Sequence, residues 1–173
     1  MKTFDCIEAR RSVRDFESTP VEDAALGKIV TAALCAPVGM RAYDSLCIRC
    51  VASKDALSEF LKMARKEMRD ETADPIHGAP ALIVVAVREV TNVAFANSAC
   101  MIENMLLAAT DLGLASLYVC GIVNALRDKP EFRQLLQLPE GFAPVGAAAI
   151  GYAKDGAPSR RPIPNKISQV KYI

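Results

Sequence analysis

The continuous apolar run Ala81–Val87 constrains the fold more than any other part of the sequence. A strand that is apolar at every position is buried on both faces, so other elements must cover it from two sides. Residues 143–152 form a second buried strand of this kind, and residues 46–52 and 114–119 are also predicted to be strands. We therefore expect a central sheet of about four strands.

Helical patterns occupy most of the remaining chain. Apolar spacing predicts helices over residues 4–11, 54–71, 93–112 and 130–136. Another helix is expected to begin at Thr19-Pro20-Val21-Glu22, with Thr19 as N-cap and Glu22 closing a capping box, and to end before Pro37. Because strands and helices do not alternate regularly, we predict an α+β fold rather than a doubly wound fold.

Two segments are too apolar for a small domain that stands alone. The helix over residues 93–112 is apolar nearly all round, which favours a partner chain on one side of it. The stretch 154–173 has no core of its own, yet its end carries Ile163, Ile167, Val170 and Ile173. We predict one domain over residues 1–173, with the segment 154–173 packed on a second subunit.

Composition limits the partners and the location. The chain has 173 residues, 21 of them basic and 20 acidic, so charge gives no reason to expect nucleic acid. The longest nearly pure apolar run, residues 79–87, falls far short of the roughly 20 residues of a membrane span. The start of the chain is polar and unlike a signal peptide, so we expect a cytoplasmic protein with reduced cysteines.

The sequence contains little evidence for a metal site or for catalysis by protein side chains alone. Cys47 and Cys50 have CxxC spacing, but in a strand such positions point to opposite faces, and His77 is the single histidine. We expect no metal site, because too few ligands are available. The sequence also contains no GxGxxG, P-loop, HExxH or GxSxG motif. If the chain is an enzyme, a cofactor is expected to carry the reaction.

The sharpest local feature is Arg10-Arg11-Ser12-Val13-Arg14. Three guanidinium groups and a hydroxyl can hold a phosphate through charge-assisted hydrogen bonds. The same cluster can equally be a solvated helix end with surface salt bridges, which is the commoner outcome for a charge run. The cluster alone does not decide between these interpretations.

A series of further motifs follows the arginine cluster in a fixed order. These are Pro20-Val21, Ala36-Pro37, His77-Gly78-Ala79-Pro80, Ile102-Glu103-Asn104-Met105, Leu112-Gly113-Leu114-Ala115-Ser116, Pro144-Val145-Gly146, Ile150-Gly151-Tyr152 and Arg160-Arg161-Pro162. In this order the motifs resemble the nitroreductase family of FMN-dependent oxidoreductases over most of the chain. No single motif is specific to the family, but the order of all of them along the chain is.

The resemblance implies an α+β fold with a central, mostly antiparallel sheet of about four to five strands, in an intertwined homodimer that binds FMN at its interface. It implies that Arg10, Arg11, Ser12 and Arg14 contact the phosphate, the ribityl chain or the pyrimidine edge of FMN. A later arginine, either Arg160 or Arg161, is expected to contact the phosphate as well. It implies a loop supplied by the other subunit near the ring, namely Pro37, Val38, Gly39 and Met40. The segment flanking the isoalloxazine is expected to be Val119, Cys120 and Gly121.

The first loop departs from the family pattern. Arg41 stands where many members have Asn, Tyr43 stands where they have Gln, and the chain has no tryptophan. Tyr43 either hydrogen-bonds or stacks on the flavin ring, or it packs after a turn. Cys120 is expected to be a small filler beside the flavin rather than a redox partner.

The resemblance predicts an enzyme that passes hydride from NAD(P)H through FMN to a small organic oxidant, such as a nitroaromatic or a quinone. Two alternatives stay open. One is a flavin-binding carrier or sensor without turnover, which the departures at Arg41 and Tyr43 allow. The other is a partner-binding domain with no cofactor, in which every arginine above lies on a solvated surface.

Overall fold

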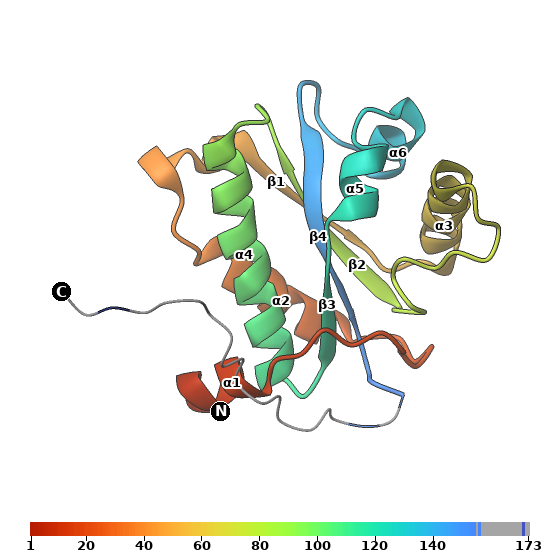
Figure 1. The fold of residues 1–173 in the computed structure, drawn as a ribbon. Helices are drawn as coiled ribbons and strands as arrows, with labels where there is room; N and C mark the ends of the chain where they lie inside the picture. Colours follow the sequence, from red (N-terminus) through yellow and green to blue (C-terminus); the bar gives the residue numbers. More distant parts are fainter. Residues whose placement is uncertain (155, 157–170, 172–173) are drawn as a thin grey trace.

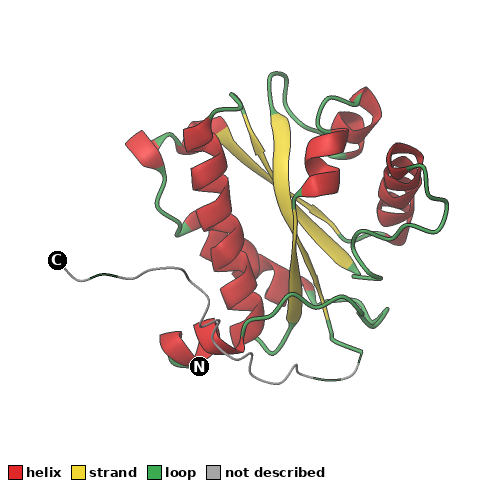
Figure 2. Ribbon diagram, in the orientation of Figure 1, coloured by secondary structure: helices red, strands yellow, loops and turns green. Residues whose placement is uncertain are grey.

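A four-stranded antiparallel sheet lies between two layers of helices (Figure 1, Figure 2). The computed structural model describes residues 1–154, 156 and 171. The strands are β1 (Leu46–Val51), β2 (Ala81–Val87), β3 (Ala115–Val119) and β4 (Ala143–Gly151), in the order β1-β2-β4-β3. The sequence prediction of a mostly antiparallel α+β sheet is confirmed.

The helices divide between the two faces of the sheet (Figure 1). One face carries α1 (Thr3–Ala9), α2 (Asp23–Leu34) and α4 (Asn92–Asp111). The other carries α3 (Lys54–Met68), α5 (Gly121–Leu126) and α6 (Pro130–Leu135). Single turns of 3-10 helix, η1 (Gly39–Arg41) and η2 (Tyr43–Ser45), precede β1.

Strand β2 explains why the chain has two cores. Its seven residues are all buried. Leu82 and Val84 belong to the core under α3, α5 and α6, whereas Ile83 and Val85 belong to the core under α2 and α4. The alternation of side chains along a strand therefore requires an apolar residue at every position.

Two predicted elements differ in the structure. Helix α2 begins at Asp23, and Glu22 makes no side-chain cap, while the Thr19 hydroxyl donates to Glu17 Oε2 at 3.3 Å. The capping-box prediction is wrong because Val21 is buried in the α2–α4 core, and the chain stays extended to bring it there. Helix α5, which follows Cys120, is not among the helices predicted from the sequence.

Candidate functional site

The arginine cluster lies in an extended segment that crosses the end of the sheet between α1 and α2. Ser12 forms an isolated parallel bridge with Ser116 of β3, and the Val13 N–H donates to the Ser116 carbonyl at 3.0 Å. Farther along, the Phe16 N–H donates to the His77 carbonyl at 3.1 Å. The segment is therefore fixed to β3 and to the loop before β2.

Because the segment is extended, its side chains alternate. Arg10, Ser12 and Arg14 lie on one side of the backbone, and Arg11 lies on the other. Arg14 lines a cavity of about 530 Å³, whereas Arg11 lines a separate cavity of about 450 Å³. The structure thus divides the five-residue cluster that the sequence suggested.

The first of these spaces, which we call the Arg14 cavity, contains three predicted cofactor-binding residues besides Arg14. They are Val119, Cys120 and Gly121, at the junction of β3 and α5. A Cβ atom on Gly121 would meet nothing within 4 Å. The remaining lining residues are Glu67, Met68, Pro75, His77, Leu117, Tyr118, Ile122 and Ala125.

The polar side chains of the arginine segment differ in their partners. The Ser12 hydroxyl and the Arg14 guanidinium are exposed, and neither makes a hydrogen bond or ion pair to another described residue. The Arg10 Nε lies 3.3 Å from Glu103 Oε1 of α4. Burial, followed by smaller contributions from Cys120 and Glu103, raises the pKa of the Tyr118 hydroxyl in the cavity wall.

His77 also lines the Arg14 cavity, although no cofactor contact was predicted for it. It adopts a left-handed conformation with φ of 54°. Asp74 holds the loop, because its carboxylate accepts from Ile76 N at 3.1 Å and from Gly78 N at 2.7 Å. The signal in the sequence was the pattern Asp74-Pro75-Ile76-His77-Gly78, since Asp side chains commonly bind the backbone of such turns.

A hydrogen-bonded chain fixes the first turn of α5 beside the cavity. The Asn124 amide donates to Cys120 Sγ at 3.0 Å, and Arg127 donates to Asn124 Oδ1. Arg127 also donates to the Pro144 carbonyl at 3.2 Å, and its guanidinium lies 5.1 Å from the centre of the Phe95 ring. The position of Cys120 is thereby tied to both β4 and α4.

The Arg11 cavity holds unsatisfied donors. Arg11 Nε and Nη2 are buried and have no hydrogen-bond partner among the described residues, and the same is true of the Ser116 hydroxyl. Both residues line this cavity together with Val13 and Tyr152. Arg11 is therefore separated from the Arg14 cavity, where a shared ligand was predicted.

The first loop lies at the opposite end of α4 from the arginine segment (Figure 1). The Gly39 N–H donates to Asn97 Oδ1 at 3.1 Å, Met40 is 98% exposed and Tyr43 is 49% exposed. A single chain therefore does not bring residues 37–40 or Tyr43 to the Arg14 cavity. Arg160 and Arg161 lie outside the described residues.

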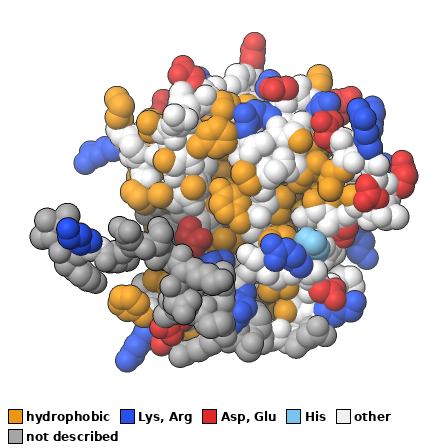
Figure 3. Space-filling model, viewed as in Figure 1, with side chains coloured by type: hydrophobic (Ala, Val, Ile, Leu, Met, Phe, Trp, Pro, Cys, Tyr) orange, Lys and Arg blue, Asp and Glu red, His pale blue; other side chains and the backbone are white. Residues whose placement is uncertain are grey.

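Large hydrophobic side chains are exposed around α4 (Figure 3). On α1, α2 and α4 they include Phe4, Ile7, Leu34 and Val93. By length and composition α4 could cross a membrane, but the core helix of a soluble protein meets the same test. One side of α4, including Met101, Ile102 and Met105, is buried in the core.

The cysteines form no metal cluster in the described part of the chain, where no group of three or more potential ligands occurs. Cys47 and Cys50 lie in β1, opposite Ala86 and Ile83 of β2. They occupy a regular strand, as expected from the sequence.

Comparisons with known proteins agree on one family. The model of the nitroreductase family matches residues 7–152. A nitroreductase of Bacteroides fragilis, solved with bound FMN, is 28% identical, with a TM-score of 0.88 and full coverage of both chains. A nitroreductase of Desulfitobacterium hafniense, also with bound FMN, is 26% identical, with a TM-score of 0.85 and 99% coverage of both chains.

A flavin oxidoreductase is also similar to this chain. An NADPH-flavin oxidoreductase of Vibrio harveyi is 26% identical over 165 residues, which cover 87% of this chain and 65% of that protein. The chain thus spans about two thirds of that relative.

Proposed function

This chain belongs to the nitroreductase family, and we propose that it is an FMN-dependent oxidoreductase that takes hydride from NAD(P)H and passes it to a small organic oxidant. The observation that carries the proposal is the Arg14 cavity, where Arg14 and the β3–α5 junction meet. Two 26–28% identical proteins of the same fold were solved with FMN. Nitroaromatics and quinones are the oxidants we expect.

The residues present suit a flavin mononucleotide. The volume of about 530 Å³ lies within the range of small-molecule sites. Exposed donors without a partner among the described residues, Ser12 and Arg14, suit the anionic parts of the molecule. The open space above Gly121 leaves room for a flat ring beside the backbone.

Each part of the site then has a chemical task. Bound FMN supplies the redox chemistry, accepting hydride from a nicotinamide and reducing an oxidant. Arg10 and Ser12 would hold the phosphate, and Arg14 would stabilise negative charge on the bound flavin. The chain from Arg127 through Asn124 to Cys120 keeps the β3–α5 junction in place. We assign Arg11 no contact with the flavin ring.

A second copy of the chain completes the site in this proposal. Phe4, Ile7, Leu34 and Val93 are exposed large apolar side chains on α1, α2 and α4, and in this proposal a second copy covers them. Residues 37–40 and Tyr43 of the partner would then approach the flavin ring. The predicted docking of the segment 154–173 on the second subunit and the predicted cytoplasmic location belong to the same proposal.

Spectroscopy of the purified protein tests the function. We expect yellow flavin absorbance, and bleaching of that absorbance when NADH or NADPH is mixed in a stopped-flow instrument. Steady-state oxidation of the nicotinamide with a quinone or nitroarene should follow. Protein that neither contains nor binds FMN would refute the proposal, and flavin that no nicotinamide reduces would favour a carrier or sensor.

A further inference from the structure

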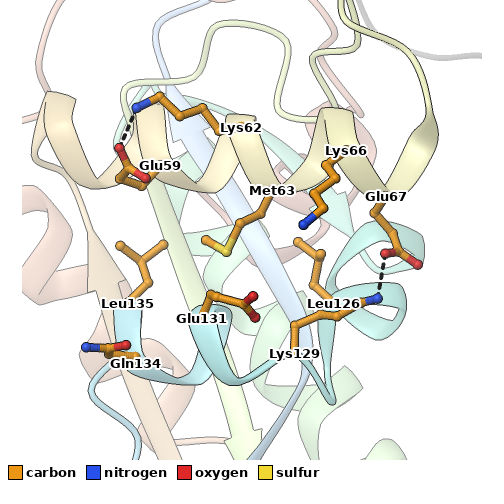
Figure 4. Close-up of a pocket in the computed structure, with 10 residues that line it drawn as sticks. All are labelled: Glu59, Lys62, Met63, Lys66, Glu67, Leu126, Lys129, Glu131, Gln134 and Leu135. Atoms are coloured by element: carbon orange, nitrogen blue, oxygen red, sulfur yellow. Dashed lines mark hydrogen bonds and ion pairs between the residues drawn. The ribbon is translucent and has the colours of Figure 1, made fainter.

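A second groove adjoins the Arg14 cavity. It measures about 470 Å³ and lies between α3 on one side and α5 and α6 on the other (Figure 4). We call it the α3–α6 groove; Glu67 lines both it and the Arg14 cavity. Glu67 Oε2 lies 2.9 Å from Lys129 Nζ, so this ion pair stands where the two spaces meet. A long ligand could therefore occupy both.

The α3–α6 groove combines an apolar surface with charged walls. Met63 of α3 points into the groove, and in this view it lies between Leu135 of α6 and Leu126 of α5 (Figure 4). Such side chains provide a surface on which a flat aromatic base can pack.

The charged side chains of the α3–α6 groove differ in their ion pairs. Lys62 pairs with Glu59 at 2.6 Å, and Lys129 pairs with Glu67. Among the described residues, no ion pair engages Lys66 or Glu131. Figure 4 shows the Lys66 ammonium and the Glu131 carboxylate both pointing into the space between the helices.

The opposed charges select for a particular ligand chemistry. A lysine ammonium is suited to a phosphate. A carboxylate is suited to the hydroxyls of a ribose, as in other sites that bind adenine dinucleotides. A base, a ribose and a phosphate together are the parts of an adenosine phosphate.

We propose that the α3–α6 groove binds the adenosine phosphate half of the reduced nicotinamide dinucleotide, while the nicotinamide enters the Arg14 cavity. Lys66 binds the phosphate, Glu131 accepts hydrogen bonds from the ribose hydroxyls, and the adenine packs on Met63, Leu126 and Leu135. The Glu67–Lys129 ion pair lies under the link between the two halves. This inference rests on the proposed use of a nicotinamide reductant.

Variants at two exposed positions test the groove without touching the flavin site. We expect Lys66→Glu and Glu131→Gln to raise the KM for NADH about fivefold, the scale of one solvent-exposed charge contact. Neither variant should change the KM for reduced nicotinamide mononucleotide, which lacks the adenosine half. Lys54→Glu is the matched control, because Lys54 is an exposed lysine at the start of the same helix but outside the groove.

A binding measurement provides a readout that does not depend on turnover. Calorimetric titration of the flavin-loaded protein with ADP-ribose should give weaker binding for Lys66→Glu and Glu131→Gln than for the wild type and Lys54→Glu. Equal ADP-ribose affinity in all four proteins, or an equal rise in KM for both reductants, would overturn the groove assignment. If the wild type oxidises neither reductant but binds ADP-ribose through Lys66, the proposed function fails while the nucleotide site stands.

Discussion

Arg11 and Arg14 are three residues apart, yet exchanging each for Met should produce opposite results. Arg14 lines the Arg14 cavity, is exposed and has no described partner. Arg11 lies on the other side of the same segment, and two of its buried nitrogen atoms have no partner in the part of the chain that the structure describes. Arg14→Met should therefore weaken FMN binding at constant stability, whereas Arg11→Met should stabilise the protein at nearly constant FMN affinity.

The magnitudes follow from the two environments. A charge-assisted hydrogen bond contributes about 1.5–3 kcal/mol, and exposure of Arg14 favours the lower end, so Kd for FMN should rise about tenfold. Replacing an exposed side chain changes stability by less than about 0.5 kcal/mol. Unsatisfied buried donors cost about 1–3 kcal/mol, and Met retains the apolar stem of Arg11. The free energy of unfolding should then rise by about 1–2 kcal/mol in Arg11→Met.

Two assays on the flavin-free protein measure the pair of effects. Quenching of FMN fluorescence gives Kd, and urea unfolding gives the free energy of unfolding. The division of the arginine cluster is refuted if Arg11→Met loses FMN as strongly as Arg14→Met does. A loss of stability in Arg11→Met would show that its guanidinium has a partner in solution.

Three further substitutions test other parts of the structure. Glu103→Gln should release Arg10 from its 3.3 Å ion pair and lower Kd for FMN about twofold at low salt; an unchanged Kd would remove Arg10 from the phosphate site. Phe132→Ala should lower the free energy of unfolding by about 3–5 kcal/mol, because Phe132 is completely buried, and a loss below about 1 kcal/mol in urea unfolding would contradict its place in the core. Gly151→Ala would put a Cβ 2.6 Å from Pro80 Cδ. It should lower the free energy of unfolding by about 1–3 kcal/mol, which would be measured as a lower Tm. An unchanged Tm would mean that the backbone shifts there without loss of stability.

Much of the fold could be predicted from local pattern. The apolar run Ala81–Val87 was correctly read as a strand buried on both faces, because its alternate residues serve different cores. The start of α2 could not be predicted, since Thr19 and Pro20 satisfy the local rules for a helix start while Val21 is drawn into a core formed by distant residues. Helix α5 has six residues and was missed because so short a pattern resembles a loop.

The site could be predicted less completely. Arg14, Val119, Cys120 and Gly121 were expected at the cofactor and do line one cavity. The separation of Arg11 depends on the bridge between Ser12 and Ser116, which joins residues about a hundred positions apart. His77 had no predicted role because its position depends on the packing of its loop against the arginine segment.

The strand order also has a consequence for biosynthesis. Among the described residues β4 is the last strand to be made, yet it lies between β2 and β3 and pairs with both. Until residues 143–151 have left the ribosome, β2 has one open edge and β3 has no neighbouring strand to pair with. During that interval the nascent chain exposes apolar strands of the kind that aggregate. The sheet can close only when nearly the whole described chain has been translated, so a chaperone that holds the nascent chain until then should raise the yield of folded protein.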